Sequence, residues 1–240
     1  MKFLSSLFLT VFCLFSAYAA EVDTVEVFSK RMNKTIKNVV IRPSGKSPQA
    51  TLYLLHGYSG KYSDWVNRVA DLKNLVDKYD YLVVCPDGGF DSWYWDTADK
   101  SYQYESYIIE ELLPFVENKF AVKADREHRA ITGLSMGGHG ALYLALRHQD
   151  KFAYAGSTSG GVDIRPFPGN WAMQKHLGTY AEHPTVWDAH TVMELTHRIK
   201  PNSLKLFIDC GTEDFFYGVN VKLHEKLTYM NVPHTFLTMP

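Results

Sequence analysis

The sequence predicts an α/β fold in which helices cover both faces of a mostly parallel sheet. Short apolar runs typical of buried strands alternate with longer helix-like stretches along the chain. The 240 residues are 46% hydrophobic and 21% charged, which is close to the composition of ordinary globular proteins. Because no repeat or linker-like tract divides the chain, we expect residues 20–240 to form a single domain.

The expected elements follow from hydrophobic periodicity and from start and stop signals. Ser63 and Asp64 mark the start of the first helix, and Pro86-Asp87-Gly88-Gly89 ends the fourth strand. The predicted strands are residues 24–28, 35–42, 51–55, 81–85, 129–132, 152–156, 204–209 and 235–239. The predicted helices are residues 63–79, 101–120 with an interruption near Pro114, 137–148 and 219–230.

The first 19 residues have the pattern of a secretory signal peptide. Lys2 precedes an apolar run over residues 3–15, and Ala17-Tyr18-Ala19 forms a small-residue cleavage site. The run is too short to span a membrane, and no later segment is long enough. We therefore expect cleavage after Ala19 and a mature protein that is secreted or periplasmic.

The charge balance of the chain argues against a nucleic-acid-binding protein. The chain has 25 Lys and Arg against 26 Asp and Glu, a formal net charge of −1. A nucleic-acid-binding protein needs an excess of positive charge to displace counterions from phosphates. We expect no nucleic-acid partner and no membrane span, and the sequence leaves the oligomeric state open.

Two cysteines, Cys85 and Cys210, remain after removal of the predicted signal peptide. Disulfides are common in exported proteins, but each of these cysteines ends an apolar run that is typical of a buried strand. The two strands are not neighbours in the usual strand order of such a fold, whereas a disulfide needs Cα atoms within about 7 Å. We expect two separate, reduced thiols.

Residues 161–201 are irregular and rich in Pro and Trp, so we expect a lid-like excursion over the sheet. Four histidines recur at seven-residue intervals from His176 to His197, and on one continuous helix they would share a face and suggest metal ligands. Gly178 and Pro184 break such a helix, and no Cys or carboxylate completes a ligand set. We expect no metal here.

The strongest chemical signal is Gly133-Leu134-Ser135-Met136-Gly137, a G-x-S-x-G motif. A predicted strand leads into it and a Gly-rich helix leads out, which is the context of a nucleophile elbow. The turn would present the Ser135 hydroxyl at a helix N-terminus, where N–H groups favour negative charge. The motif predicts Ser135 as a nucleophile; the alternative is an ordinary turn with Ser135 as a helix N-cap.

A serine nucleophile of this design needs two backbone N–H donors for the oxyanion that forms on attack. One comes from the residue after the nucleophile, Met136. The other comes from the loop after the third strand, His56-Gly57-Tyr58, and we assign it to Tyr58. We expect His56 to hydrogen-bond within this loop; a role as general base is the alternative.

An acidic residue after a late strand is needed to orient a catalytic histidine. Asp209, Glu213 and Asp214 are close together in the sequence. Asp209 still lies inside the predicted strand, whereas Asp214 lies beyond its carboxyl end, where the active sites of open α/β sheets collect. The prediction is therefore Asp214, with Glu213 as the alternative.

Four blocks of the sequence together resemble the esterase D-type "putative esterase" family of α/β-hydrolases. This group includes S-formylglutathione hydrolase, tributyrin esterase, feruloyl and acetylxylan esterases, and mycolyltransferases. The resemblance runs from about Asn38 to Pro240 and implies an α/β-hydrolase fold with Ser135 as nucleophile and Asp214 as acid. It likewise implies that Tyr58 and Met136 are the oxyanion donors. The blocks are Leu54-Leu55-His56-Gly57, Ser92-Trp93-Tyr94, residues 133–140 and residues 209–214.

The resemblance also concerns three aromatic side chains. It implies that Trp93 and Tyr94 lie near the acyl or alcohol pocket and bind substrate, with core packing as the alternative. His139 matches a family position but lies in the predicted helix after the elbow, so we expect it to be structural.

The catalytic histidine of the family follows the last strand in a Pro-Gly-Gly-His run, which is absent before the final Pro240. Of the histidines after Asp214, His224 lies within a predicted helix. His234 lies at the entry end of the last strand, about 20 Å from the nucleophile's end of the sheet. We therefore expect a chain truncated at or after the last strand, with the catalytic histidine just beyond Pro240.

These features predict an exported serine carboxylesterase that works through an acyl-enzyme, with no metal or organic cofactor. Its expected partner is a small-molecule or oligosaccharide ester, such as an acylated plant polysaccharide. Two alternatives remain: a mycolyltransferase-like transfer of the acyl group to a sugar hydroxyl, and a non-catalytic carbohydrate-binding pseudoenzyme. The sequence does not distinguish water from an alcohol as the acyl acceptor.

Overall fold

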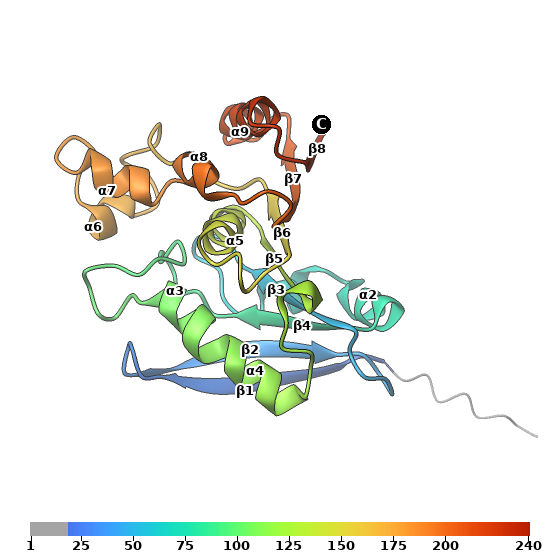
Figure 1. Ribbon diagram of the computed structural model, residues 1–240. Helices are drawn as coiled ribbons and strands as arrows, with labels where there is room; N and C mark the ends of the chain where they lie inside the picture. The colour runs from blue at the N-terminus through green and yellow to red at the C-terminus, as the bar shows by residue number, and fades with distance from the viewer. Residues whose placement is uncertain (1–18) are drawn as a thin grey trace, which may run out of the picture.

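The computed structural model describes residues 19–240, which form one eight-stranded sheet with helices packed against it (Figure 1). The strand order is β1-β2-β4-β3-β5-β6-β7-β8. β2 is antiparallel to both β1 and β4, and every other neighbouring pair is parallel. The predicted, mostly parallel α/β sheet is confirmed. The strands are β1 (Glu21–Ser29), β2 (Lys34–Arg42), β3 (Ala50–Leu55), β4 (Tyr81–Pro86), β5 (Arg129–Gly133), β6 (Tyr154–Thr158), β7 (Lys205–Gly211) and β8 (His234–Met239).

Each predicted strand has a counterpart, but the one predicted at 152–156 begins two residues later. Phe152 is fully buried, and its ring packs edge-on against Tyr53 with a centroid distance of 6.3 Å. The Ala153 N–H donates to the Arg126 carbonyl, at the 3-10 turn η2 (Arg126–His128). These two residues anchor the core before the ladder of β6 starts.

The predicted helix 63–79 is two helices, α1 (Asp64–Arg68) and α2 (Leu72–Tyr79). Val69 separates them because its backbone is extended, with φ −103° and ψ 92°. The sequence has helical spacing before and after Val69, and each part forms a helix, but one helix axis does not continue through this residue.

The predicted helix 101–120 starts later, at α3 (Tyr104–Ser106), and continues through a π-helical turn, η1 (Tyr107–Leu112), into α4 (Leu113–Phe120). The predicted interruption near Pro114 takes the form of this wider turn. Pro114 has no N–H to donate to the preceding turn, and the π-helical turn lies directly before it.

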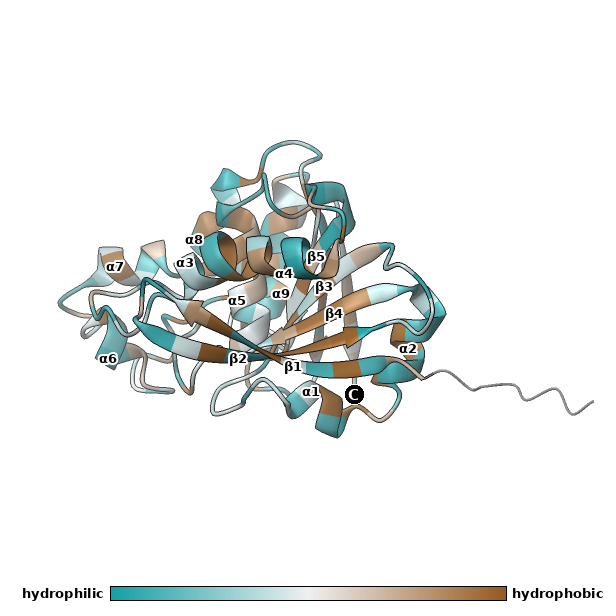
Figure 2. Cartoon of the chain, turned by 90° about the horizontal axis from the view of Figure 1, so that it is seen from below, coloured by the Kyte–Doolittle hydropathy of each residue, from teal (hydrophilic) through white to brown (hydrophobic). Residues whose placement is uncertain are grey.

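Helices cover the two faces of the sheet unequally. The helix 104–120, α5 (Met136–Arg147) and α9 (Tyr217–Tyr229) pack on one face, and α2 packs on the other. Figure 2 shows the apolar residues of β3 and β4, which lie in the middle of these layers. Over β6, β7 and β8 the face shared with α2 is open, and its apolar side chains are exposed. These are Tyr154, Phe207, Leu237 and Met239.

The segment 161–201 consists of short elements (upper left in Figure 1). His176 lies in the first of them, His183 and His190 flank the second, and His197 lies in the last. Their seven-residue spacing therefore does not place them on one helix face. The elements are α6 (Met173–Leu177), α7 (Pro184–Ala189), α8 (Val192–Leu195) and η3 (Thr196–Arg198).

Within residues 19–240, no helix has the length and apolar character needed to cross a membrane. The predicted signal peptide falls on residues 1–19, and residues 1–18 lie outside the described part of the chain. That prediction and the assignment of a single domain over 20–240 therefore stay predictions.

A buried carboxylate holds the C-terminal end of α5. Glu105 accepts hydrogen bonds from Arg147 Nε at 2.8 Å, His148 Nε2 at 2.6 Å and the Tyr143 hydroxyl at 3.3 Å. Burial opposes ionisation of Glu105, but the bonds from His148 and Arg147 outweigh it and lower the pKa of the carboxyl. Because Ser135 directly precedes α5, this network fixes the helix that begins at the candidate nucleophile.

Both cysteines are free and buried, and β3, β5 and β6 lie between their strands. Burial raises the pKa of Cys85 to about 12, so its thiol stays protonated and unreactive at neutral pH. We expect a thiol titration of the protein without residues 1–19 to count both cysteines after denaturation and almost none within minutes in the native state. Denatured protein that shows no free thiol would contradict the separation of the two strands.

Glu105→Gln should lower the free energy of unfolding by about 1–3 kcal/mol at pH 7, because the amide cannot pair with Arg147. The pKa of Glu105 is lowered by folding, so its contribution is present above the unfolded pKa of about 4.3. It is lost as the pH falls through the folded pKa. Urea unfolding between pH 7 and pH 3 should show the difference shrinking. As a control, Glu127→Gln at an exposed ion pair should cost less than about 0.5 kcal/mol, and a pH-independent difference for Glu105→Gln would argue against the network.

Candidate active site

Ser135 lies in a strained turn between β5 and α5. Its φ of 57° and ψ of −115° are unusual for any residue with a side chain, and such a conformation costs on the order of 1–3 kcal/mol. The Ser135 N–H donates to the Thr158 carbonyl at 2.9 Å, and its own carbonyl accepts from the His139 N–H at 2.9 Å. The turn therefore presents the half-buried side chain of Ser135 directly before the first residue of α5, as the G-x-S-x-G motif predicts.

The two glycines of the motif are required by close backbone packing. A Cβ on Gly133 would lie 2.6 Å from the Leu55 carbonyl oxygen, and a Cβ on Gly137 would clash with the same oxygen. Leu55 ends β3, so the end of this strand touches the elbow on both sides of Ser135. The following loop is close too, because a Cβ on Gly57 would lie 3.5 Å from the Ser135 Cβ.

This arrangement puts the two predicted oxyanion donors next to the elbow. Met136 is the first residue of α5, and Tyr58 follows Gly57 in the loop that lies against Ser135. Within residues 19–240, neither N–H donates to a protein acceptor. By contrast, the Ser59 N–H is engaged with the Phe90 carbonyl at 2.8 Å, so the choice of Tyr58 over its neighbour has a structural basis.

His56 shapes this loop through both ring nitrogens. Its Nδ1 lies 2.8 Å from the Gly57 carbonyl, and its Nε2 accepts from the Gly88 N–H at 2.8 Å. Burial lowers the pKa of the ring, which is consistent with a neutral imidazole. With both nitrogens engaged, His56 has the loop-shaping role that the sequence favours over a role as general base.

Asp214 lies in the turn after β7, at the same edge of the sheet as Ser135. Hydrogen bonds link the carboxyl ends of β5, β6 and β7. The Ser135 N–H donates to the Thr158 carbonyl, and the Ser159 N–H donates to the Asp209 carbonyl at 2.8 Å. Asp214 is half-buried, and its Oδ1 accepts from the Phe216 N–H at 2.7 Å. No hydrogen bond joins Asp214 to Ser135 within the described chain, and β6 lies between their two strands.

The alternative acids are placed differently. Glu213 is exposed, whereas Asp209 lies within β7, where its carboxylate accepts from the Thr158 hydroxyl at 3.0 Å. Burial raises the pKa of Asp209. Only Asp214 combines a position beyond the strand with partial burial.

The ten histidines all lie within residues 19–240, and none of their imidazole nitrogens hydrogen-bonds to Ser135 or Asp214 there. His224 Nδ1 lies 2.8 Å from His234 Nε2, and His234 pairs with Leu206 near the start of β7. This pair is therefore at the entry end of β8, as the sequence predicts.

Trp93 and Tyr94 are buried, with exposed fractions of 1% and 0%. The Trp93 N–H donates to Met136 Sδ at 3.4 Å, and the Tyr94 hydroxyl donates to the His56 carbonyl at 3.0 Å. Both therefore pack behind the elbow and the loop, in the core position that the sequence left as the alternative. A direct substrate contact at either residue remains a prediction that this burial does not favour.

His139 is also buried, one turn into α5. Its Nε2 accepts from Trp95 Nε1 at 2.9 Å, and its Nδ1 lies 2.8 Å from the Gly161 carbonyl. Burial lowers the pKa of this ring to about 3, so it is neutral and structural. It ties the start of α5 to the beginning of the segment 161–201.

A pocket of about 410 Å³ opens beside Ser135. Trp171 forms part of its wall, and sequence reasoning missed this residue. Trp171 and Ala172 have positive φ values of 47° and 58°, which are rare for residues with side chains. The only signal in the sequence is the position of Trp171 in the irregular, Pro-rich segment. The pocket is lined by His56, Gly57, Tyr58, Ser59, Gly60, Asp64, Trp65, Arg68, Val69, Leu134, Ser135 and Trp171.

Comparison with known proteins agrees with this geometry. The model of the family described as "Putative esterase" matches residues 29–232. The chain is 26% identical to an acetyl esterase of Caldicellulosiruptor saccharolyticus over 228 residues, 85% of this chain and 84% of the relative. It is 35% identical to an esterase of Mycobacterium tuberculosis over 229 residues, 83% of this chain, and spans 49% of that relative's length.

Among solved structures, the fluorophosphonate-binding serine hydrolase FphF of Staphylococcus aureus has the same fold. The TM-score is 0.82 at 24% identity, over 92% of this chain and 91% of that one. The family match covers the elbow, the loop after β3 and the acid turn after β7. The chain therefore belongs to this esterase family and has the α/β-hydrolase fold.

Proposed function

We propose that this protein is an exported serine carboxylesterase that acts on small acyl esters or on acylated plant polysaccharide. The observation that carries the proposal is the strained Ser135 at the start of α5, facing a pocket and flanked by two unengaged backbone N–H groups. The similarity to an acetyl esterase supports the choice of an ester substrate. Export rests on the signal-peptide pattern of residues 1–19.

In the proposed mechanism, Ser135 Oγ attacks the ester carbonyl while a general base removes its proton. The carbonyl oxygen becomes an oxyanion, which would accept hydrogen bonds from the Met136 and Tyr58 N–H groups. The base passes the proton to the leaving alkoxide, so collapse of this intermediate releases the alcohol and leaves an acyl group on Ser135. Water, deprotonated by the same base, then attacks the acyl-enzyme, and the base gives that proton to Ser135 Oγ as the acid leaves. No step needs a metal or an organic cofactor.

We further propose that the base is a histidine on the segment following β8. Two observations support this placement. No imidazole nitrogen of the ten histidines within residues 19–240 hydrogen-bonds to Ser135 or Asp214, and the Thr212 N–H donates to the Met239 carbonyl at 2.8 Å. A Cβ on Gly211 would lie 3.8 Å from the Met239 oxygen and 3.9 Å from Asp214 Cβ. A chain leaving β8 would therefore pass beside the carboxylate that is to orient the imidazole.

Ser135→Ala should abolish ester hydrolysis, because the covalent step loses its nucleophile. The measurement is the release of p-nitrophenol from p-nitrophenyl acetate or butyrate by an active, full-length protein. Ser47→Ala is a matched control, since Ser47 is an exposed serine outside the site, and it should keep the parent rate. More than a few per cent of parent activity in Ser135→Ala would refute this assignment of the nucleophile.

The 240-residue chain should hydrolyse these esters roughly 10³–10⁴-fold more slowly than a form that supplies the base. The coding sequence should continue past Pro240 with a Gly-rich turn and a histidine within about ten residues. Only neutral imidazole accepts a proton, so the rate of the longer protein should fall below a pH of about 6.5. A stop codon directly after Pro240, with full activity in that product, would mean that another residue is the base.

A further inference from the structure

We propose that Trp171 and Phe215 form a ring-binding platform that selects esters whose alcohol carries a six-membered ring. This inference rests on the proposed esterase function, because it assigns one part of the substrate to one side of Ser135. The shared chemistry is a six-membered ring with weakly positive C–H groups, which lie on the edge of a phenol and on the face of a pyranose. The experiment below separates these two sources.

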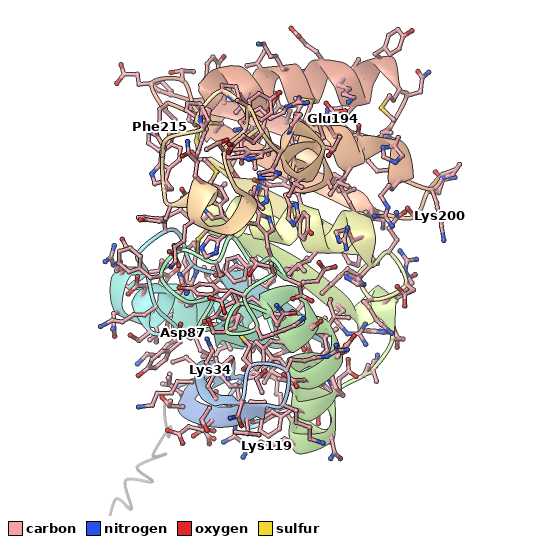
Figure 3. All side chains as sticks on the ribbon, turned by 90° about the vertical axis from the view of Figure 1, so that its left-hand side faces the viewer. Lys34, Asp87, Lys119, Glu194, Lys200 and Phe215 are labelled. Atoms are coloured by element: carbon pink, nitrogen blue, oxygen red, sulfur yellow. The ribbon has the colours of Figure 1, made fainter. Side chains whose placement is uncertain are left out.

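The platform is a pair of stacked aromatic rings, one in the pocket wall and one at the surface. The rings of Trp171 and Phe215 are stacked, with centroids 5.3 Å apart and an interplanar angle of 29°. Trp171 lines the Ser135 pocket, and Phe215 is 61% exposed at the surface (Figure 3). The buried Phe216 and the partly buried Phe167 support Trp171, with centroids 5.0 Å and 5.6 Å away. An exposed aromatic surface with this support beside a pocket is typical of a binding site.

Trp171 lies in a strained segment of backbone that contacts with neighbouring residues hold in place. Trp171 and Ala172 both have positive φ, and side-chain-bearing residues keep such angles only where their surroundings enforce them. The enforcing contact is the Trp93 indole N–H, which donates to the Trp171 carbonyl at 3.2 Å. Four residues further on, Lys175 Nζ pairs with the buried Asp91 at 2.9 Å and anchors α6. Trp93 is therefore a positioning residue for the platform.

The location of the platform indicates which part of the ester it meets. Phe215 directly follows Asp214, whose carboxylate accepts from the Phe216 N–H. A histidine oriented by Asp214 must also protonate the leaving alkoxide, so the alcohol departs on the Asp214 side. The platform lies on that side and would contact the alcohol. The acyl group would then take the part of the pocket lined by Trp65, Val69 and Leu134.

A ring on the alcohol would gain from this surface in a way that a short alkyl group would not. The face of an aromatic ring carries partial negative charge, which attracts the weakly positive C–H edge of a phenol or the C–H face of a pyranose. An ethyl group covers too little of the two rings to gain the same contact. The platform therefore discriminates between alcohols while leaving the acyl group and the oxyanion unaffected.

The test compares kcat/KM for three acetyl esters: phenyl acetate, an acetylated methyl xyloside and ethyl acetate. We expect Trp171→Ala and Phe215→Ala to lose about 5–10-fold on at least one ring-bearing ester and less than about threefold on ethyl acetate. A loss confined to phenyl acetate assigns a phenol, and a loss confined to the xyloside assigns a sugar. Trp171→Phe keeps a ring and should stay within about threefold of the parent. Trp93→Phe, which removes the N–H donor, should shift the same ratio in the same direction.

The control is Phe28→Ala, an exposed phenylalanine on β1 that should change none of the three rates. Equal losses on ring-bearing and ethyl esters, or no loss at all, would overturn the platform while leaving the esterase function in place. The parent is the longer form that supplies the base, and if it hydrolyses none of the esters, the esterase proposal fails. Saturation-transfer NMR with phenol and methyl xyloside then tests the platform alone: binding lost in Trp171→Ala supports it, and no binding by the parent overturns it.

Discussion

The site depends on one backbone approach that tolerates no side chain. The carbonyl oxygen of Leu55, at the end of β3, lies against both Gly133 and Gly137, and a Cβ at either position would overlap it. This contact brings the elbow and the loop after β3 together. It thereby sets the distance between Ser135 and the Tyr58 backbone, and it makes room for the strained conformation of Ser135. A substitution here would move the nucleophile and one oxyanion donor apart in a single step.

The parts of this arrangement that are local in sequence were predictable. The G-x-S-x-G motif determines its own turn, and the position of Asp214 after β7 follows from where the strand ends. The mostly parallel sheet follows from the alternation of strands and helices, and the separation of Cys85 and Cys210 follows from the usual strand order of such a fold. Each of these features depends on a short run of residues and on a general rule of the fold.

The features that sequence reasoning missed depend on contacts between distant segments. Trp171 reaches the pocket because Trp93, 78 residues earlier, holds its carbonyl, and no local pattern signals that bond. The later start of β6 has the same origin, since Phe152 packs against Tyr53 from a distant strand. Trp93 lies near functional residues, as the family resemblance implies, but its contacts are with Met136 Sδ and the Trp171 carbonyl. The family resemblance places Trp93 close to the candidate site, and its packing contacts determine which groups its side chain and backbone meet.

The buried imidazole of His139 has an electrostatic consequence for the whole elbow. Because its pKa is about 3 and both nitrogens are engaged, the ring carries no charge anywhere in the neutral range. The first turn of α5 therefore contains no group that gains or loses a proton around neutral pH. Its contribution to the field at Ser135 comes from backbone dipoles, and the partial positive charge of the helix N-terminus favours an oxyanion there. Any change of rate with acidity in this range must therefore arise from groups outside this turn.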